Sequence, residues 1–371
     1  MKSILVLGGG QLGLMMAGDA ARLGVTLDRV DTNNDLLLRG SSFRTSESIS
    51  ASVVGNYDAV TAEMEHLPDS PLVNDIRRQS QWVNETAFQN LVNRRDQKTL
   101  LDQLGLATSP WIALGSDADL DGAFRHCGKH LVVKTERGGY DGKGQWRISS
   151  ANQSDLPDSV YGQAIAEALI PFTREVSLVG ARNRQGRCFF YPLAENAHRE
   201  GILRTSICGR PEKPELQQQA QEMLSCLMYH LNYVGVMAME CFDTGDRLLI
   251  NEIAPRVHNS GHWSQLGATH SQFSLHVRAL ADLPFPDQPQ YSRTLMLNLI
   301  GCEFDHRWLA LDGAQCHWYG KEACRPGRKM GHINLDLDSG NRTDSTIKNL
   351  LPLVDEVHRQ ALQDAMESLS R

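Results

Sequence analysis

The N-terminal stretch "SILVLGGGQLGLMMAGDAARLG" constrains the fold most, because it predicts a strand, a glycine turn and a helix in direct succession. "ILVL" is a continuous apolar run typical of a buried parallel strand, and "LGLMMAGDAARL" has helical spacing that ends at Gly24. Two further strands are predicted from "VTLDRVD" and "YDAVTAEMEHLP". Together these segments indicate a compact parallel α/β unit at the start of the chain.

The glycine turn also suggests a ligand. Gly8 to Gly13 reads GxGxxG, and Asp31 follows 18 residues after Gly13, as in a dinucleotide-binding turn. An NAD-dependent dehydrogenase is therefore one hypothesis. The same turn also suits the phosphate of another substrate, because a helix N-terminus attracts anions.

Composition narrows the function classes. The chain has 371 residues, enough for two or three domains, and a net charge of -7, which argues against binding to nucleic acid or to a membrane surface. No apolar stretch reaches transmembrane length. The eight cysteines are scattered without a CxxC pair, so we expect reduced thiols in a cytoplasmic enzyme.

Changes in amino-acid composition and in the predicted secondary structure along the chain predict three domains. A charged amphipathic helix follows Asn93, and the proline-rich stretch 283–290 precedes a β-rich remainder that ends in a helix. The predicted units are an N-terminal domain over 1–92, a two-lobed domain over 93–286 whose lid spans about 110–170, and a small C-terminal domain over 287–371.

Two carboxylates close adjacent apolar runs in the predicted hairpin "VMAMECFDTGDRLLINEIAP". If the loop spans 243–247, Glu240 faces Ile250, and Glu240 and Glu252 then lie diagonally on one face with Cα atoms about 7–8 Å apart. Two carboxylates together with phosphate oxygens are a usual way to hold Mg²⁺. The alternative interpretation is a pair of exposed strand glutamates.

A lysine and a glycine-rich segment suggest a polyphosphate. Lys134 ends the apolar run "LVV", and "GGYDGKGQ" (138–145) permits close backbone approach and positive φ. It is not a Walker loop, and a plain hairpin tip is the alternative. Further along, Pro326 and Gly327 bend "KEACRPGRK" so that basic side chains converge, which suits a phosphomonoester better than a solvated turn.

Several segments carry a resemblance to a known family. Lys98, Lys134, "GGYDGKGQ", "EALI" (167–170), Glu175, "VMAMECF" and "NEIAPRVHNSGHW" resemble the ATP-grasp ligases, and more narrowly the N5-carboxyaminoimidazole ribonucleotide synthetases of purine biosynthesis. The resemblance runs from "LGGGQLGLM" to "RPGRKMGHINL". It implies an α/β (α+β overall) chain with a parallel α/β pre-ATP-grasp domain, a two-lobed ATP-grasp domain and a small β-rich C-terminal domain.

The resemblance also implies roles for individual residues. The residues placed at ATP are Arg94, Lys134, Gly139, Tyr140, Asp141, Gly142, Lys143, Gly144, Gln145, Glu167, Ala168, Leu169, Ile170, Glu175, His198, Asn251 and Glu252. Those placed at the ribonucleotide are Gly10, Gln11, Leu12, Glu65, Lys321, Arg325 and Arg328. Glu240 and Glu252 would carry Mg²⁺ or Mn²⁺. Two departures are Ala254, where many members show Asn after the second metal acid, and Val257, where proline is frequent.

The implied reaction uses ATP to activate bicarbonate as carboxyphosphate. Carboxyphosphate, or CO2 released from it, then carboxylates the amine of 5-aminoimidazole ribonucleotide. Arg256, His258 and Lys134 would be its catalytic residues. Arg256 offers a planar fork to bicarbonate, and His258 would orient it, relay a proton or serve only structure. The resemblance also implies a homodimer. A formate-using glycinamide ribonucleotide transformylase and an inactive binding module are the remaining alternatives.

Overall fold

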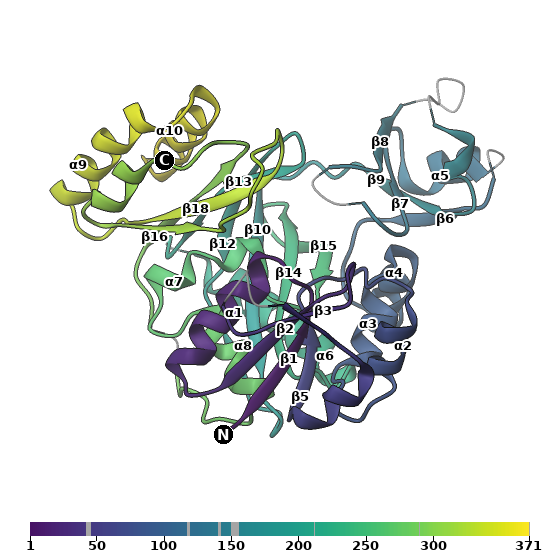
Figure 1. Ribbon diagram of the computed structural model, residues 1–371. Coiled ribbons are helices and arrows are strands. Elements are labelled where there is room, and N and C mark those ends of the chain that lie inside the picture. The colour runs from purple at the N-terminus through teal and green to yellow at the C-terminus, as the bar shows by residue number, and fades with distance from the viewer. Residues whose placement is uncertain are drawn as a thin grey trace.

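The computed structural model describes residues 1–41, 46–116, 119–139, 142–149, 156–210, 212–288 and 290–370. Within them the chain forms three sheets, which lie in an N-terminal unit, a lid and a central body (Figure 1). No helix in this described part has the length and apolar character needed to cross a membrane.

The N-terminal unit contains the predicted parallel α/β arrangement. Its sheet has the order β4-β3-β2-β1-β5, in which β1 (Ser3–Leu7) pairs in parallel with β2 (Thr26–Asp31) and with β5 (Ala59–Ala62). Helix α1 (Gln11–Arg22) follows β1 directly. The other elements of the unit are β3 (Leu36–Leu38), β4 (Ser46–Ser48), α2 (Pro71–Arg77) and α3 (Glu85–Leu91).

The lid is a four-stranded antiparallel sheet in the described residues, ordered β6-β9-β7-β8. Its strands are β6 (Trp111–Leu114), β7 (Leu131–Thr135), β8 (Gln145–Ile148) and β9 (Ala164–Ala168), and helix α5 (Asp119–Cys127) covers one face. Helix α4 (Arg94–Gln103) leads into the lid. The side chain of Asn93 caps α4 by accepting hydrogen bonds from Arg95 and Asp96, and this fixes where the helix begins.

The central body is built on one nine-stranded sheet among the described residues, ordered β15-β14-β10-β12-β13-β16-β18-β17, with β11 beside β10. The strands are β10 (Arg174–Arg182), β11 (Cys188–Phe190), β12 (Ala194–Arg199), β13 (Ile202–Cys208), β14 (Gly235–Asp243), β15 (Leu248–Ala254), β16 (Thr294–Ile300), β17 (Ala314–Trp318) and β18 (Lys329–Asp336). The strands of the predicted C-terminal domain therefore extend the sheet of the preceding region, because β13 pairs with β16.

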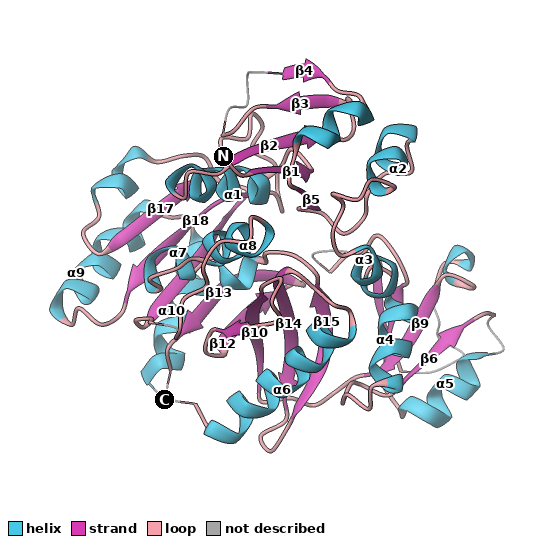
Figure 2. Cartoon of the chain, turned by 90° about the horizontal axis from the view of Figure 1, so that it is seen from below, coloured by secondary structure: helices cyan, strands magenta, loops and turns pink. Residues whose placement is uncertain are grey.

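Helices cover this sheet and join it to the N-terminal unit. Helix α6 (Pro214–His230) packs on β10 and β15, and α8 (Gln272–Leu280) packs on β10 and β14 while also contacting α1 (Figure 2). Helices α9 (Asn341–Leu350) and α10 (Glu356–Ser370) bury the apolar face of the C-terminal strands. The short helix α7 (Ser264–Gly267) lies against β18.

The register of the β14–β15 hairpin differs from the prediction. Asp243 pairs with Leu248, so the loop has four residues rather than five, and a bulge at Asn251 shifts the ladder by one more residue. Glu240 therefore lies directly opposite Glu252, and the predicted pairing of Glu240 with Ile250 is wrong. The hairpin and the shared face of the two acids were predicted correctly.

Candidate active site

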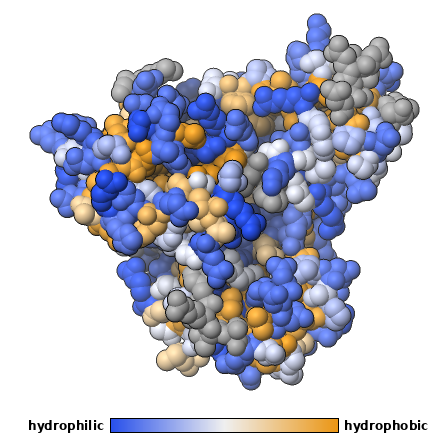
Figure 3. Space-filling view, turned by 45° about the horizontal axis from the view of Figure 1, so that its top comes forward, coloured by the Kyte–Doolittle hydropathy of each residue, from blue (hydrophilic) through white to orange (hydrophobic). Residues whose placement is uncertain are grey.

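A cavity of about 950 Å³ lies where the N-terminal unit, the lid base, the hairpin and the loop before β18 meet. Hydrophilic and hydrophobic side chains are interspersed over the face of the molecule shown in Figure 3. Of the residues expected to bind substrates, the cavity is lined by Gln11, Leu12, Glu65, Gly139, Lys143, His198, Glu240, Glu252, Arg256, His258, Lys321, Arg325 and Arg328. Residues that are far apart in sequence and were expected to bind three different substrates therefore border one space.

Glu240 and Glu252 face each other, and their negative charges repel. Burial raises the pKa of Glu240, and the charges of Glu252 and Glu175 raise it further, against a lowering effect of His198. Arg94 lies 3.6 Å from Glu252. No group of three or more acidic, His or Cys side chains suited to a metal ion occurs among the described residues. A cation at this pair would thus take its other ligands from a nucleotide or from water, as Mg²⁺ commonly does.

Lys134 is held in place by a buried charge network. Its ammonium donates to Glu167 at 2.9 Å and to the bulged Asn251 at 3.0 Å. Lys98 lies 3.2 Å from the other carboxylate oxygen of Glu167 and donates to Thr108. Burial raises the pKa of Glu167, but the two lysines outweigh burial and hold it below its usual value. The Glu167 side chain is therefore engaged with lysines, and it positions Lys134.

The glycine segment bridges the lid to the other units. Arg94 donates to the backbone oxygens of Thr135 at 2.8 Å and Gly139 at 2.7 Å. Gly138 donates its N–H to His66 of the N-terminal unit at 3.1 Å. A side chain at Gly142 would come within 2.9 Å of the backbone oxygen of Glu200. The predicted positive φ values occur at 138, 142 and 144, whereas Tyr140 and Asp141 lie outside the described residues.

Two residues that were expected at the nucleotide form a pair with each other. His198 Nδ1 lies 2.5 Å from a carboxylate oxygen of Glu175. Burial lowers the pKa of His198, but the bond to Glu175 and the charge of Glu240 raise it overall. Beyond the segment 167–170, Phe172 is 43% exposed and stacks on Phe242, so an apolar surface borders the segment expected near adenine.

Arg256 lies 2.6 Å from Glu65, which links the predicted bicarbonate and ribonucleotide sites. His258 accepts a hydrogen bond at Nδ1 from the backbone N–H of Ser260 (3.3 Å), so its neutral ring carries the proton on Nε2. Burial and the charges of Arg256 and Lys329 hold the pKa of His258 well below its usual value. His258 is therefore a hydrogen-bond donor at Nε2, which argues against accepting a proton there. Val257 is fully buried.

The basic cluster, Lys321, Arg325 and Arg328, also lines the cavity. Lys321 donates to the backbone oxygen of Lys329 at 2.7 Å, and Arg328 donates to that of Ala323 at 2.7 Å. Gly327 has a φ of +77°, which allows the predicted bend. Arg325 is exposed at the rim. The expected convergence of these side chains on one space is consistent with the structure.

The glycine turn of the N-terminal unit already has an anion. The backbone N–H groups of Gly10 and Gly13 donate to the carboxylate of Glu63, the latter at 2.5 Å. A side chain at Gly8 would overlap Glu63, and one at Gly13 would come within 2.9 Å of Arg29. The glycines make room for these internal partners. The N–H groups of Gly10 and Gly13 are therefore engaged by Glu63 and are not available to a dinucleotide.

Sequence reasoning missed Lys329, Glu63 and His66. Lys329 lines the cavity, and its charge lowers the pKa values of His198, Glu240 and His258. The only sequence signal for Lys329 is its place at the end of the basic run 321–329, of which Lys321, Arg325 and Arg328 were predicted to bind the ribonucleotide. Glu63 and His66 flank the predicted Glu65, but their partners are distant in sequence, so no local pattern marks them.

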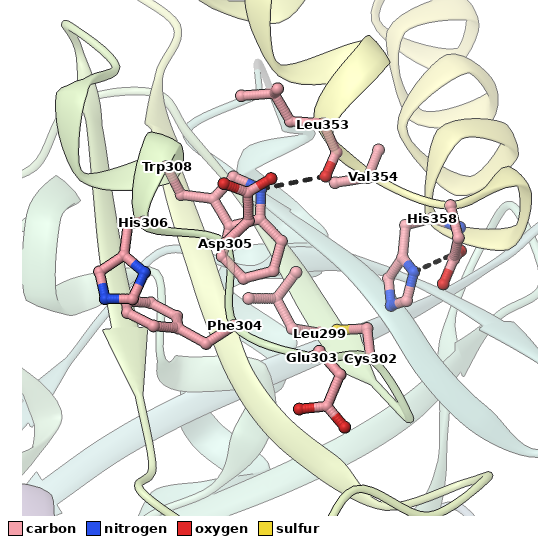
Figure 4. Close-up of a pocket in the computed structure, with 11 residues that line it drawn as sticks. Leu299, Cys302, Glu303, Phe304, Asp305, His306, Trp308, Leu353, Val354 and His358 are labelled. Carbon is pink, nitrogen blue, oxygen red and sulfur yellow. Dashed lines mark hydrogen bonds and ion pairs between the residues drawn. The ribbon is translucent and has the colours of Figure 1, made fainter.

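A second cavity of about 520 Å³ lies on the C-terminal part of the chain, between Trp308 and His358 (Figure 4). His358 bonds through one ring nitrogen to Asp355 and through the other to the backbone N–H of Ile300. No Lys or Arg is among the described residues that line this cavity. It is therefore unsuited to a phosphate ester.

Comparisons with known proteins match three family models along the chain. Residues 1–88 match the ribonucleotide synthetase preATP-grasp domain, 99–273 the ATP-grasp domain, and 294–346 the phosphoribosylaminoimidazole carboxylase C-terminal domain. The N5-carboxyaminoimidazole ribonucleotide synthase of Escherichia coli is 44% identical over 95% of this chain and 96% of its own. That of Haemophilus influenzae is 42% identical over 99% and 98%.

Solved structures extend the likeness to three dimensions. The N5-carboxyaminoimidazole ribonucleotide synthetase of Thermus thermophilus has a TM-score of 0.83 and 35% identity, over 95% of this chain and 99% of its own. The Aspergillus clavatus N5-carboxyaminoimidazole synthase, in complex with ADP and 5-aminoimidazole ribonucleotide, has a TM-score of 0.82 and 25% identity, over 98% and 99%.

Proposed function

The chain belongs to the N5-carboxyaminoimidazole ribonucleotide synthase family, and on that premise we propose how its residues divide the reaction. It is an ATP-grasp ligase that carboxylates 5-aminoimidazole ribonucleotide with ATP in purine biosynthesis. The single observation that carries the proposal is the direct opposition of Glu240 and Glu252 in a cavity that also contains Arg256 and the basic cluster.

The nucleotide end of the cavity is assigned first. Glu240 and Glu252 would hold Mg²⁺, or Mn²⁺, and this ion would supply positive charge beside the transferring phosphoryl group. Lys134 and Arg94 neutralise phosphate oxygens, and the glycine segment 138–145 closes over them. Asn251 and Glu167 keep Lys134 in position through the bonds described above. Phe172 and the segment 167–170 border adenine.

Bicarbonate lies at the centre, bound by Arg256 with His258 and Lys329 nearby. One of its oxygens attacks the γ-phosphorus of ATP, the bond to the bridging oxygen breaks, and ADP leaves. The exocyclic amine of the ribonucleotide then attacks the carboxyl carbon of carboxyphosphate, phosphate leaves, and the nitrogen loses a proton. Arg256 must exchange Glu65 for bicarbonate, and Glu65 then becomes available to a ribose hydroxyl.

The ribonucleotide phosphate occupies the far end. Lys321, Arg325 and Arg328 provide three positive charges there, and Gln11 and Leu12 border the sugar and base. We further propose that the chain works as a cytoplasmic homodimer. Its domains are taken as 1–92, 93–286 with a lid at about 110–170, and 287–371.

The decisive experiment measures phosphate release from MgATP plus bicarbonate, with and without 5-aminoimidazole ribonucleotide. We expect release to depend on the ribonucleotide, and to be lost in Glu252→Gln and Arg256→Ala. A Glu240→Gln variant should need more Mg²⁺ for half-maximal rate, because one of the two charged ligands is gone. Equal stimulation by glycinamide ribonucleotide and formate would instead identify a transformylase.

A further inference from the structure

His262 borders the active-site cavity without a role in the division of labour above. It is 1% exposed and follows the 3-10 turn η4 (Asn259–Gly261). Its ring stacks on His332, with centroids 4.7 Å apart, and lies 5.5 Å from the ring of Phe273. Gln272 bonds to its Nδ1 at 2.9 Å. The ring edge left for the cavity is therefore the edge that carries Nε2.

The hydrogen bonds of Gln272 fix the tautomer of His262. The Gln272 amide oxygen accepts from the backbone N–H of His258 at 2.9 Å, and its amide nitrogen donates to the backbone oxygen of the same residue at 2.7 Å. A backbone N–H only donates and a carbonyl only accepts, so the amide has one orientation. Its second N–H must then be donated to Nδ1 of His262, and the neutral imidazole carries its proton on Nε2.

The surroundings keep this donor neutral and immobile. Burial, and then the charges of His317, Lys329 and Arg256, hold the pKa of His262 well below its usual value. Gln272 is fully buried. A side chain at Gly261 would come within 2.7 Å of the Gln272 amide oxygen, so glycine is needed there for the amide to fit. This network holds Nδ1 of His262 as an acceptor, and it therefore keeps the proton of the neutral ring on Nε2.

His258 and His262 therefore present the same chemistry. Both have Nδ1 occupied by an obligatory donor, both are neutral, and both line the cavity that Arg256 borders. A planar carbonate has three oxygens, and the fork of one guanidinium satisfies two of them. Neutral N–H donors can bind the remaining oxygen without repelling Arg256, and they do not exchange protons with the anion.

We propose that His262, positioned by Gln272, donates a hydrogen bond from Nε2 to the carbonate held by Arg256 and to the carboxyphosphate formed from it. This inference rests on the function proposed above. It assigns bicarbonate recognition to one more side chain, and it makes Gln272 a positioning residue for the reaction.

Steady-state kinetics with varied bicarbonate test His262 directly. In His262→Phe, which keeps a stacked ring without a donor, kcat/KM for bicarbonate should fall on the order of 100-fold, as for the loss of one preorganised donor. KM for the ribonucleotide and for ATP should stay unchanged. His262→Gln, which restores an N–H, should recover most of the loss. His317→Phe is the matched control and should behave as wild type. His317 also stacks on His332, but it is not among the described residues that line the cavity.

A Gln272→Glu variant tests the tautomer. A carboxylate cannot donate to Nδ1 of His262, so the ring should move its proton to Nδ1 and lose the Nε2 donor. The rate should fall at neutral pH and recover as the pH is lowered, because the protonated ring again carries an Nε2–H. Nitrogen NMR of labelled histidine should report the change of tautomer.

Three outcomes would overturn the inference. These are unchanged bicarbonate kinetics in His262→Phe, a loss confined to KM for the ribonucleotide, and a Gln272→Glu rate without recovery at low pH. Circular dichroism and thermal unfolding of each variant separate misfolding from loss of the donor. The wild-type protein tests the function separately, because absence of ribonucleotide-dependent phosphate release would reject the function whatever His262 does.

Discussion

Glu167 shows how one buried side chain organises the nucleotide end of the cavity. It is 2% exposed and lies between Lys98, which is equally buried, and Lys134. One carboxylate between two ammonium groups leaves a net positive charge beside the place where phosphates are expected. The cost of burying these charges is offset only while all three are present.

Replacing Glu167 by Gln should destabilise the protein by about 3–5 kcal/mol, because two buried ammonium groups would lose their counter-charge. Urea unfolding monitored by circular dichroism measures the loss. The matched control is Glu356→Gln, which breaks the exposed pair with Arg359 and should change stability by no more than about 0.5 kcal/mol. Equal small effects in both variants would show that the network is solvated.

His276 predicts a defined pH dependence of stability. It is fully buried, accepts at Nδ1 from the backbone N–H of Val236, and burial lowers its pKa from 6.5 to about 4. The unfolded chain then binds more protons than the folded chain between these two values. Stability is thus complete above pH 6.5 and is lost as the pH falls toward 4, by about 3 kcal/mol at most from this residue.

Urea unfolding at pH 7.5, 6.0 and 4.5 measures this dependence. His276→Gln should start less stable at pH 7.5, because a fully packed ring is lost, but its stability should fall less steeply with acid. A curve parallel to that of the wild type would show that other groups cause the acid sensitivity.

The β1–α1 turn is an element whose shape depends on one carboxylate. A side chain at Gly8 would overlap Glu63, and Gly8 has a φ of +120°, so Gly8→Ala is expected to cost several kcal/mol, on the order of a strained and overpacked core site. Gly18→Ala, on the exposed face of α1 with no atom within 4 Å, should instead stabilise by about 0.5–1 kcal/mol. Thermal unfolding compares them. A similar loss in both would mean that the overlap is relieved elsewhere.

The glycine segment is expected to protect the reactive intermediate. Its Gly138 N–H bonds to His66, which belongs to a different unit, and this contact holds the segment over the cavity. His66→Ala should therefore raise the ratio of phosphate released to ribonucleotide carboxylated, because water reaches carboxyphosphate. Paired assays of phosphate and product measure the ratio. His130→Ala, on the lid, is the control, and an unchanged ratio in His66→Ala would reject the role.

Sequence reasoning found these elements more readily than their register. The periodicity of apolar residues and the turn residues predicted β1, α1, β7 and the β14–β15 hairpin, because these signals are local in the sequence. The bulge at Asn251 and the four-residue loop were missed, since neither changes the hydrophobic pattern that was used to pair the strands. Glu63 was missed for another reason. Its partners lie about fifty residues earlier in the chain, and a glycine turn looks the same whether its anion is a ligand or a side chain.

The whole molecule combines one continuous sheet with one separate lid. The acids lie on β14 and β15, and the basic cluster lies in the loop that joins β17 to β18 of the same sheet, so one sheet supports both the expected metal ligands and the expected phosphate ligands. The proline-rich stretch at 283–290 predicted a domain boundary, but composition cannot reveal that β13 and β16 pair across it. The lid instead contacts the rest of the chain at separate points, including Lys134 with Asn251 and Gly138 with His66.

This arrangement predicts where nucleotide binding stabilises the structure. A non-hydrolysable ATP analogue with Mg²⁺ should slow backbone hydrogen exchange in the lid, above all in β7 and β9, because the lid has few other contacts with the body. Exchange in β16 and β18 should change little. Hydrogen-exchange mass spectrometry with and without the analogue measures both. Equal protection of the lid and these strands would show that the body also moves.

The bulge at Asn251 makes the active site sensitive to the length of a strand as well as to its residues. Removing Asn251 would leave a regular ladder in which Glu252 still lies opposite Glu240, but it would take away the amide oxygen that accepts a hydrogen bond from Lys134. An alignment gap of one position here would therefore mark a homologue that keeps the two opposed acids and must hold its lysine by another side chain.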